Sequence, residues 1–155
     1  MSLVMDGVIA ISGNENINVS LDQSRFRNYV IKATASTPFV ALEMSNRSLL
    51  IKGVSNPQNP VDFYDKIDKM LAYYLVEGSN SISVNFSLDY FNTGSARCLY
   101  LLMAQLREFK ENGMSVQANW YYKIDDEDML LSGKNFSSYS QLELKLQPTS
   151  PMKYY

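Results

Sequence analysis

The side chains best placed to carry chemistry in this chain are the hydroxyls of one run, Asn92-Thr93-Gly94-Ser95. An alternating segment precedes the run and an apolar-periodic segment follows it, which predicts a junction between a strand and a helix. A hydroxyl at a helix N-terminus can take a phosphate, because free N–H groups and the helix dipole favour negative charge there. Gly94 would let a kinase or a partner approach the backbone closely. A simpler interpretation competes, since Asn, Thr and Ser are favoured N-cap residues.

The side chains that most enzymes use are missing. The sequence has no histidine and one cysteine, Cys98. These counts exclude Ser-His-Asp and Cys-His nucleophiles, His-ligated zinc and thiolate metal clusters. We therefore predict no catalytic residue, no cofactor and no metal, and we expect Cys98 to be an inert buried thiol.

One acidic run, Asp125 to Asp128, leaves an enzymatic alternative open. Four carboxylates suggest a metal-dependent hydrolase, but consecutive acids do not have the spacing of metal ligands. Acids in the first turn of a helix stabilise it through the dipole. We favour that structural role.

The composition indicates a globular protein whose charge does not favour binding to nucleic acid or to a membrane surface. Apolar residues make up 46% and charged residues 19%, with a formal net charge of −2. The sequence has no stripe of basic residues, so we expect binding neither to nucleic acid nor to a membrane surface. No apolar run approaches the ~20 residues that span a bilayer. The first ten residues lack the basic region of a signal peptide, so we expect a cytoplasmic protein.

The chain divides into three parts by its patterning. Residues 1–34 read as a polar N-terminal extension that can hold a strand, 35–148 as one domain, and 149–155 as a flexible tail. Strands are predicted over 39–44, 49–52, 81–90, 114–120 and 142–146, with the chain loosening from Gln147. Helices are predicted from Pro60 to a glycine cap at Gly78, over 94–112, and over 125–131.

This order of elements predicts the fold. Strands separated by helices imply parallel pairs, and the opening hairpin is antiparallel. In 81–90 one set of alternate residues is apolar and the other polar, so one face of the sheet is buried; the apolar set is Ile82, Val84, Phe86, Leu88 and Tyr90. We therefore expect an α/β fold, with a mixed sheet of about five strands and helices on one face. No glycine-rich nucleotide-binding motif follows any strand.

Several stretches, in order and spacing, resemble the SiaC family of bacterial regulatory phosphoproteins over about 37–146. The stretches are Thr37-Pro38, Gly53 to Asn59 followed by Phe63-Tyr64, Leu88 to Ala96, Asn119 to Tyr122, and Asp125 to Leu130. The family fold is similar to the STAS domains of anti-sigma-factor antagonists, which agrees with a sheet covered on one face.

The resemblance implies a non-enzymatic partner-switching protein. A cognate kinase phosphorylates a threonine, here Thr93 with Ser95 as the reserve, and a metal-dependent Ser/Thr phosphatase removes the phosphate. The unphosphorylated form binds and activates a diguanylate cyclase, which raises cyclic di-GMP and favours biofilm formation. The partner-binding residues would be Tyr90, Phe91, Asn92, Thr93, Gly94 and Ser95. A constitutive STAS-like binding or scaffold module, without phosphorylation, is the alternative.

Overall fold

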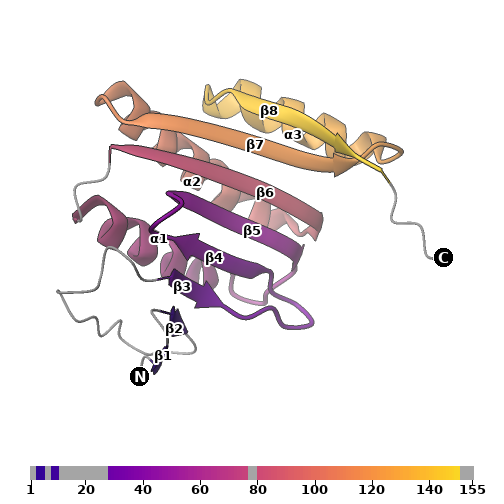
Figure 1. The fold of residues 1–155 in the computed structure, drawn as a ribbon. Coiled ribbons are helices and arrows are strands. Elements are labelled where there is room, and N and C mark those ends of the chain that lie inside the picture. The colour runs from indigo at the N-terminus through magenta and orange to yellow at the C-terminus, as the bar shows by residue number, and fades with distance from the viewer. Residues whose placement is uncertain (1–2, 6–7, 11–27, 77–79, 151–155) are drawn as a thin grey trace.

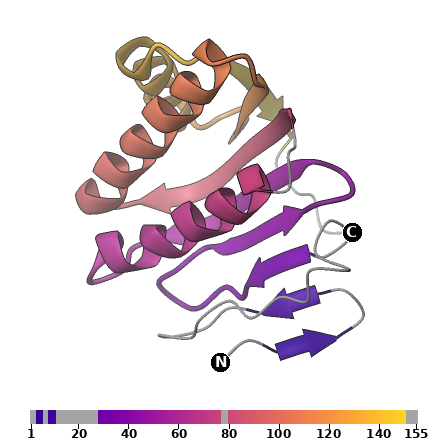
Figure 2. The ribbon, with the colours of Figure 1, turned by 90° about the vertical axis from the view of Figure 1, so that its left-hand side faces the viewer.

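A computed structural model describes residues 3–5, 8–10, 28–76 and 80–150. In these residues eight strands form one sheet in chain order, with three helices on one of its faces (Figures 1 and 2). The strands are β1 (Leu3–Met5), β2 (Val8–Ala10), β3 (Asn28–Ile31), β4 (Phe39–Glu43), β5 (Ser48–Ser55), β6 (Ser81–Phe91), β7 (Ser115–Lys123) and β8 (Leu144–Thr149). The helices are α1 (Pro60–Val76), α2 (Thr93–Glu111) and α3 (Glu127–Ser140).

The pairing confirms the predicted mixed sheet. β3, β4 and β5 pair antiparallel. β5, β6, β7 and β8 pair parallel, with one helix between each two consecutive strands of this group, and β2 also pairs parallel with β3. The strands beyond the five predicted, β1 to β3, all fall within the predicted extension, and β3 pairs with β4 over its whole length.

Several elements end further along the chain than predicted. β5 runs to Ser55 and β7 to Lys123, each three residues past the predicted end. α3 continues to Ser140 instead of stopping at Leu131, and β8 continues to Thr149, so the chain is not loose from Gln147. Pro148 is compatible with β8 because β8 is the last strand of the sheet and has an unpaired edge. The predicted cap at Gly78 lies outside the described residues.

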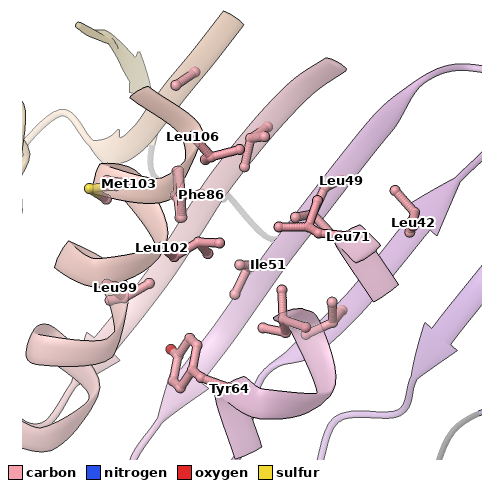
Figure 3. Packing of buried hydrophobic residues seen from close by; sticks show 14 of the residues in the cluster. Leu42, Leu49, Ile51, Tyr64, Leu71, Phe86, Leu99, Leu102, Met103 and Leu106 are labelled. Atoms are coloured by element: carbon pink, nitrogen blue, oxygen red, sulfur yellow. The ribbon is translucent and has the colours of Figure 1, made fainter. Parts of the chain in front are cut away.

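The core fills the space between the sheet and the helical layer. Its largest fully buried side chains come from both strands and helices. Each strand turns every second residue inward, and these residues pack against the inner faces of the helices. Figure 3 shows Leu49, Ile51 and Phe86 of the sheet packed under Leu71, Leu102 and Leu106 of the helices. Among the helices of the described residues, none is long and apolar enough to cross a membrane.

A β-bulge in β6 overturns one predicted side-chain direction. Gly53 pairs with Leu88 and Val54 pairs with Tyr90, so Asp89 has no partner in β5. An extra residue reverses the inward and outward alternation beyond it. The alternation predicts that Tyr90 is buried with Leu88, but Tyr90 is 52% exposed. Phe91 turns inward instead and packs against the ring of Trp120.

The uncovered face of the sheet carries a ladder of amide side chains. Asn119 donates from Nδ2 to Oδ1 of its cross-strand partner Asn85 at 3.0 Å. Gln147 donates from Nε2 to Oδ1 of Asn119 at 3.3 Å. The polar face predicted from the alternation is therefore internally bonded across β6, β7 and β8.

The close approach of α3 to the sheet explains why the helix runs through a glycine. Trp120 is fully buried, and its indole Nε1 donates to the carbonyl of Met129 at 2.9 Å. A Cβ atom on Gly133 would lie 2.5 Å from Cδ1 of Trp120 and 2.9 Å from Cδ2 of Leu146. Only glycine lets the helix lie this near to the indole ring.

Replacing Gly133 with alanine should therefore destabilise the fold although alanine favours helices. We expect Gly133→Ala to lower the free energy of unfolding by about 2 kcal/mol, because overpacking a filled core forces side chains from their rotamers. Urea unfolding measures this free energy. The matched control is Asn135→Ala at an exposed position of the same helix, which should change it by less than about 0.5 kcal/mol. Equal effects of the two substitutions would contradict the packing argument.

Candidate functional site

The predicted junction lies where β6 ends at Phe91 and α2 begins at Thr93. Asn92 is the N-cap of α2, and its Oδ1 accepts a hydrogen bond from the backbone N–H of Ser95 at 2.8 Å. The cap interpretation of the run is thus confirmed and assigned to the asparagine. Thr93 is the first helical residue, so its hydroxyl is not needed as the cap.

Asn92 also joins the junction to the loop that precedes α1. Its Nδ2 donates to Oδ1 of Asn56 at 3.1 Å and to the carbonyl of Pro57 at 3.2 Å. Its backbone N–H donates to the carbonyl of Ser55 at 2.9 Å. One residue therefore fixes the end of β6, the start of α2 and the β5–α1 loop relative to one another.

Beneath the junction, three hydroxyls form a buried hydrogen-bonded chain. Ser55 Oγ donates to Ser95 Oγ at 2.8 Å, and Ser95 Oγ donates to the carbonyl of Ser55 at 3.2 Å. Since a serine hydroxyl has one proton, the 2.8 Å contact between Ser55 Oγ and the Tyr64 hydroxyl has Tyr64 as its donor. Ser55 and Ser95 are both 0% exposed. Tyr64 lies between α1 and the sheet (Figure 3), and its burial raises its pKa to about 12.

Gly94 has a packing role that the sequence did not predict. A Cβ atom there would lie 2.7 Å from Cγ of Pro60, the first residue of α1. The glycine lets the N-termini of α1 and α2 pack closely together. Access to the backbone, the role predicted for this position, stays a prediction.

The predicted partner-binding residues are divided between surface and interior. Thr93 and Gly94 are exposed, as is Tyr90, whereas Asn92 is half-buried and Ser95 is completely buried. The ring of Phe91 packs 6.2 Å from that of Trp120 and 5.6 Å from that of Phe136, measured between centroids.

The junction also depends on residues that we did not predict as part of the site. Ser55, Asn56, Pro57 and Tyr64 support it from the β5–α1 loop and from α1. The signal for them was present in the stretches Gly53 to Asn59 and Phe63-Tyr64, which carry the family resemblance. Nothing in those stretches indicated that they meet the junction.

The acids near the junction belong to neighbouring elements, such as Asp62 in the first turn of α1. The first turn of α2 has no acidic residue, and Arg97 is exposed one turn along the same helix. The side chains of Asp89 and Lys123 form an exposed ion pair at 3.8 Å. Burial raises the pKa of Cys98, a buried free thiol as predicted.

The acidic run has the structural role that we favoured. Asp126 caps α3, because its Oδ1 accepts from the backbone N–H of Met129 at 3.0 Å. Glu127 and Asp128 occupy the first turn. Within the described residues no three His, Cys, Asp or Glu side chains lie close enough together to hold a metal ion.

Comparison with known proteins places this architecture in a family. Residues 31–149 match the SiaC family, described as regulatory phosphoproteins. An uncharacterized protein of Pseudomonas aeruginosa (strain UCBPP-PA14) is 25% identical over 92 residues, which cover 59% of this chain and 73% of that protein.

Two solved structures of SiaC from Pseudomonas aeruginosa have the same fold. One is SiaC as the activator in complex with the diguanylate cyclase SiaD, with a TM-score of 0.72. The other is apo-SiaC, with a TM-score of 0.70. Each is 22% identical, and each match covers 77% of this chain and 98% of the SiaC chain.

The two functions of the Asn92 side chain can be separated by substitution. Asn92→Ala removes both the cap and the loop contacts, and we expect it to lower the free energy of unfolding by about 2 kcal/mol. Asn92→Ser keeps an N-cap oxygen but loses the loop contacts, so about half of that loss is expected. Urea unfolding compares the two variants. Equal losses would show that the loop contacts alone matter.

The buried hydroxyl of Tyr64 predicts a pH dependence of stability. Its pKa is about 12 in the folded protein, against an ordinary value of 10.0 for a solvated tyrosine, so the unfolded chain releases the proton first. The stabilisation is complete below about pH 10 and is lost as the pH rises towards 12. From about pH 9 to about pH 11.5, wild type should lose on the order of 2 kcal/mol more stability than Tyr64→Phe.

A matched control isolates this effect from the titration of the other tyrosines. Tyr139 is 72% exposed, so Tyr139→Phe should follow the pH dependence of wild type. Denaturant unfolding at both pH values gives the comparison. If Tyr64→Phe followed wild type as well, the buried hydroxyl would not be the source.

Proposed function

This chain belongs to the SiaC family of regulatory phosphoproteins, and on that basis we propose that reversible phosphorylation of Thr93 controls its binding to a downstream protein. The chain would act by partner switching and would catalyse no reaction itself. Its working surface is the exposed part of the β6–α2 junction, formed by Tyr90, Thr93 and Gly94.

The observation that carries this proposal is the contrast between two hydroxyls of one helical turn. Thr93 is exposed, and a kinase can reach it without opening the fold. Ser95 is 0% exposed, and its hydroxyl is bonded to both Oγ and the carbonyl of Ser55. Phosphorylation of Ser95 would require α2 to detach from the β5–α1 loop. We therefore assign the modification to Thr93 and not to the reserve residue.

A phosphate on Thr93 would change the junction through charge and solvation. It adds about 1.5 to 2 negative charges at pH 7 to a first helical turn that has no acid. The helix N-terminus tolerates that charge, so α2 remains folded. A partner docked on the unmodified junction would have to strip water from the phosphate in order to bury it, and this desolvation disfavours binding.

The proposed partners follow from the family and from one relative. A cognate Ser/Thr kinase adds the phosphate, and a metal-dependent Ser/Thr phosphatase removes it. SiaC of Pseudomonas aeruginosa, 22% identical, forms a complex with the diguanylate cyclase SiaD as its activator. We extend this relation to the present chain: its unphosphorylated form binds a diguanylate cyclase, raises cyclic di-GMP and favours biofilm formation.

Binding measurements on three forms of the protein test this proposal. With a diguanylate cyclase from the same cell, wild type and Thr93→Ala should bind alike, and the Thr93-phosphorylated form should bind at least about tenfold more weakly. Calorimetry or biolayer interferometry gives the dissociation constants. Equal constants for all three forms would refute control by Thr93.

A kinase assay with matched variants locates the modified hydroxyl. Ser138 is an exposed serine of α3, so Ser138→Ala should be phosphorylated like wild type, whereas Thr93→Ala should not be. Mass spectrometry of protein from the native host shows whether Thr93 carries a phosphate there. If the protein bound its partner but carried no phosphate on Thr93 in the host, the constitutive STAS-like module would be favoured.

A further inference from the structure

Arg97 lies one turn after Thr93 on α2, and building on the phosphorylation proposed above, we propose that it is the internal counter-ion of the Thr93 phosphate. In the phosphorylated protein, the guanidinium would bind the phosphate oxygens along the surface of the helix. The modification would then alter two turns of α2 instead of one side chain.

The spacing of the two residues permits this contact. Thr93 and Arg97 are both exposed and are four residues apart in α2. Residues at this spacing are neighbours on one helix face, with Cβ atoms about 5–6 Å apart. An acidic group placed N-terminal to a basic one is also the more favourable orientation, and a guanidinium can bind two phosphate oxygens at once.

Arg97 is available for such a contact. In the part of the chain that the structure describes, no ion pair or side-chain hydrogen bond involves it. Arg107, on the same helix, is by contrast engaged by Glu111 at 3.2 Å and by Gln141 at 2.9 Å. The first turn of α2 contains no acid that would repel the phosphate.

The acids of the neighbouring helix α1 include Asp62 in its first turn, to which Asn59 donates at 2.8 Å, and Asp68. Asp68 and Arg97 both act on the pKa of Cys98, which burial raises most, Asp68 raises further and Arg97 lowers. They do not form an ion pair with each other. A phosphate carries about 1.5 to 2 negative charges against one on Asp68, and it lies on the helix of Arg97 itself. The phosphate is therefore the stronger partner.

The consequence reaches beyond the first turn. Arg97 forms an exposed stripe of α2 together with Tyr100, which is 38% exposed, and Leu101, which is 53% exposed. In the unmodified protein this stripe begins with one positive charge. After phosphorylation its net charge is about −1, and the guanidinium is drawn towards the start of the helix. A protein that contacts the stripe would thus meet a different surface.

Phosphorus-31 NMR of the full chain, with phosphothreonine incorporated at position 93 during translation, tests the proposal. The phosphate signal is titrated at low salt in wild type, Arg97→Gln and Lys110→Gln. Loss of the counter-ion should raise the titration midpoint of Arg97→Gln by about 0.3 pH unit, and ~1 M salt should remove the difference. Lys110→Gln removes the same charge from an exposed site roughly 25 Å along the helix, so its midpoint should match wild type.

Every outcome decides the point. Equal midpoints in wild type and Arg97→Gln would overturn the proposal, and equal shifts in both variants would show a general effect of net charge. Because the phosphate is installed without a kinase, this titration does not depend on whether Thr93 is modified in the cell. A midpoint shift together with an unphosphorylated Thr93 in the host would refute the proposed function while leaving the contact intact.

Discussion

The junction depends on one amide side chain that is bonded at both of its ends. The Asn92 oxygen caps α2, and its nitrogen holds the loop before α1. A serine or threonine at this position could supply the oxygen but not the paired donors. The asparagine therefore holds the end of β6, the N-terminus of α2 and the loop before α1 together, and the adjacent threonine is presented from this bonded support.

Below this surface, close packing and hydrogen bonding assign different roles to similar residues. Thr93 and Ser95 have the same functional group, but one faces solvent and the other is enclosed with Ser55 and Tyr64. The glycine between them permits contact with Pro60. A hydroxyl that is bonded on both sides is a structural part of the core, and only a hydroxyl outside that network remains free for chemistry.

From residue 39 onwards, the periodicity of the sequence was sufficient for the order of the elements, the mixed sheet and the single helical layer, because those features follow from which residues must be buried. The direction of Tyr90 was not predictable in this way, since the unpaired Asp89 reverses the alternation without a signal in the hydrophobic pattern. The contribution of Ser55 and Asn56 to the site depends on contacts between distant segments. The fit of Gly133 against an indole ring is likewise a contact between distant segments, which the hydrophobic pattern does not indicate.

The amide ladder on the open face has a consequence for how the strands find their alignment. A slip by one residue would turn the apolar side chains of a strand to solvent, but a slip by two would preserve the inside–outside pattern. Such a slip would separate Asn85 from Asn119, which face each other across β6 and β7. The polar face thus favours the observed register of β6 and β7 over a two-residue slip that would keep the inside–outside pattern.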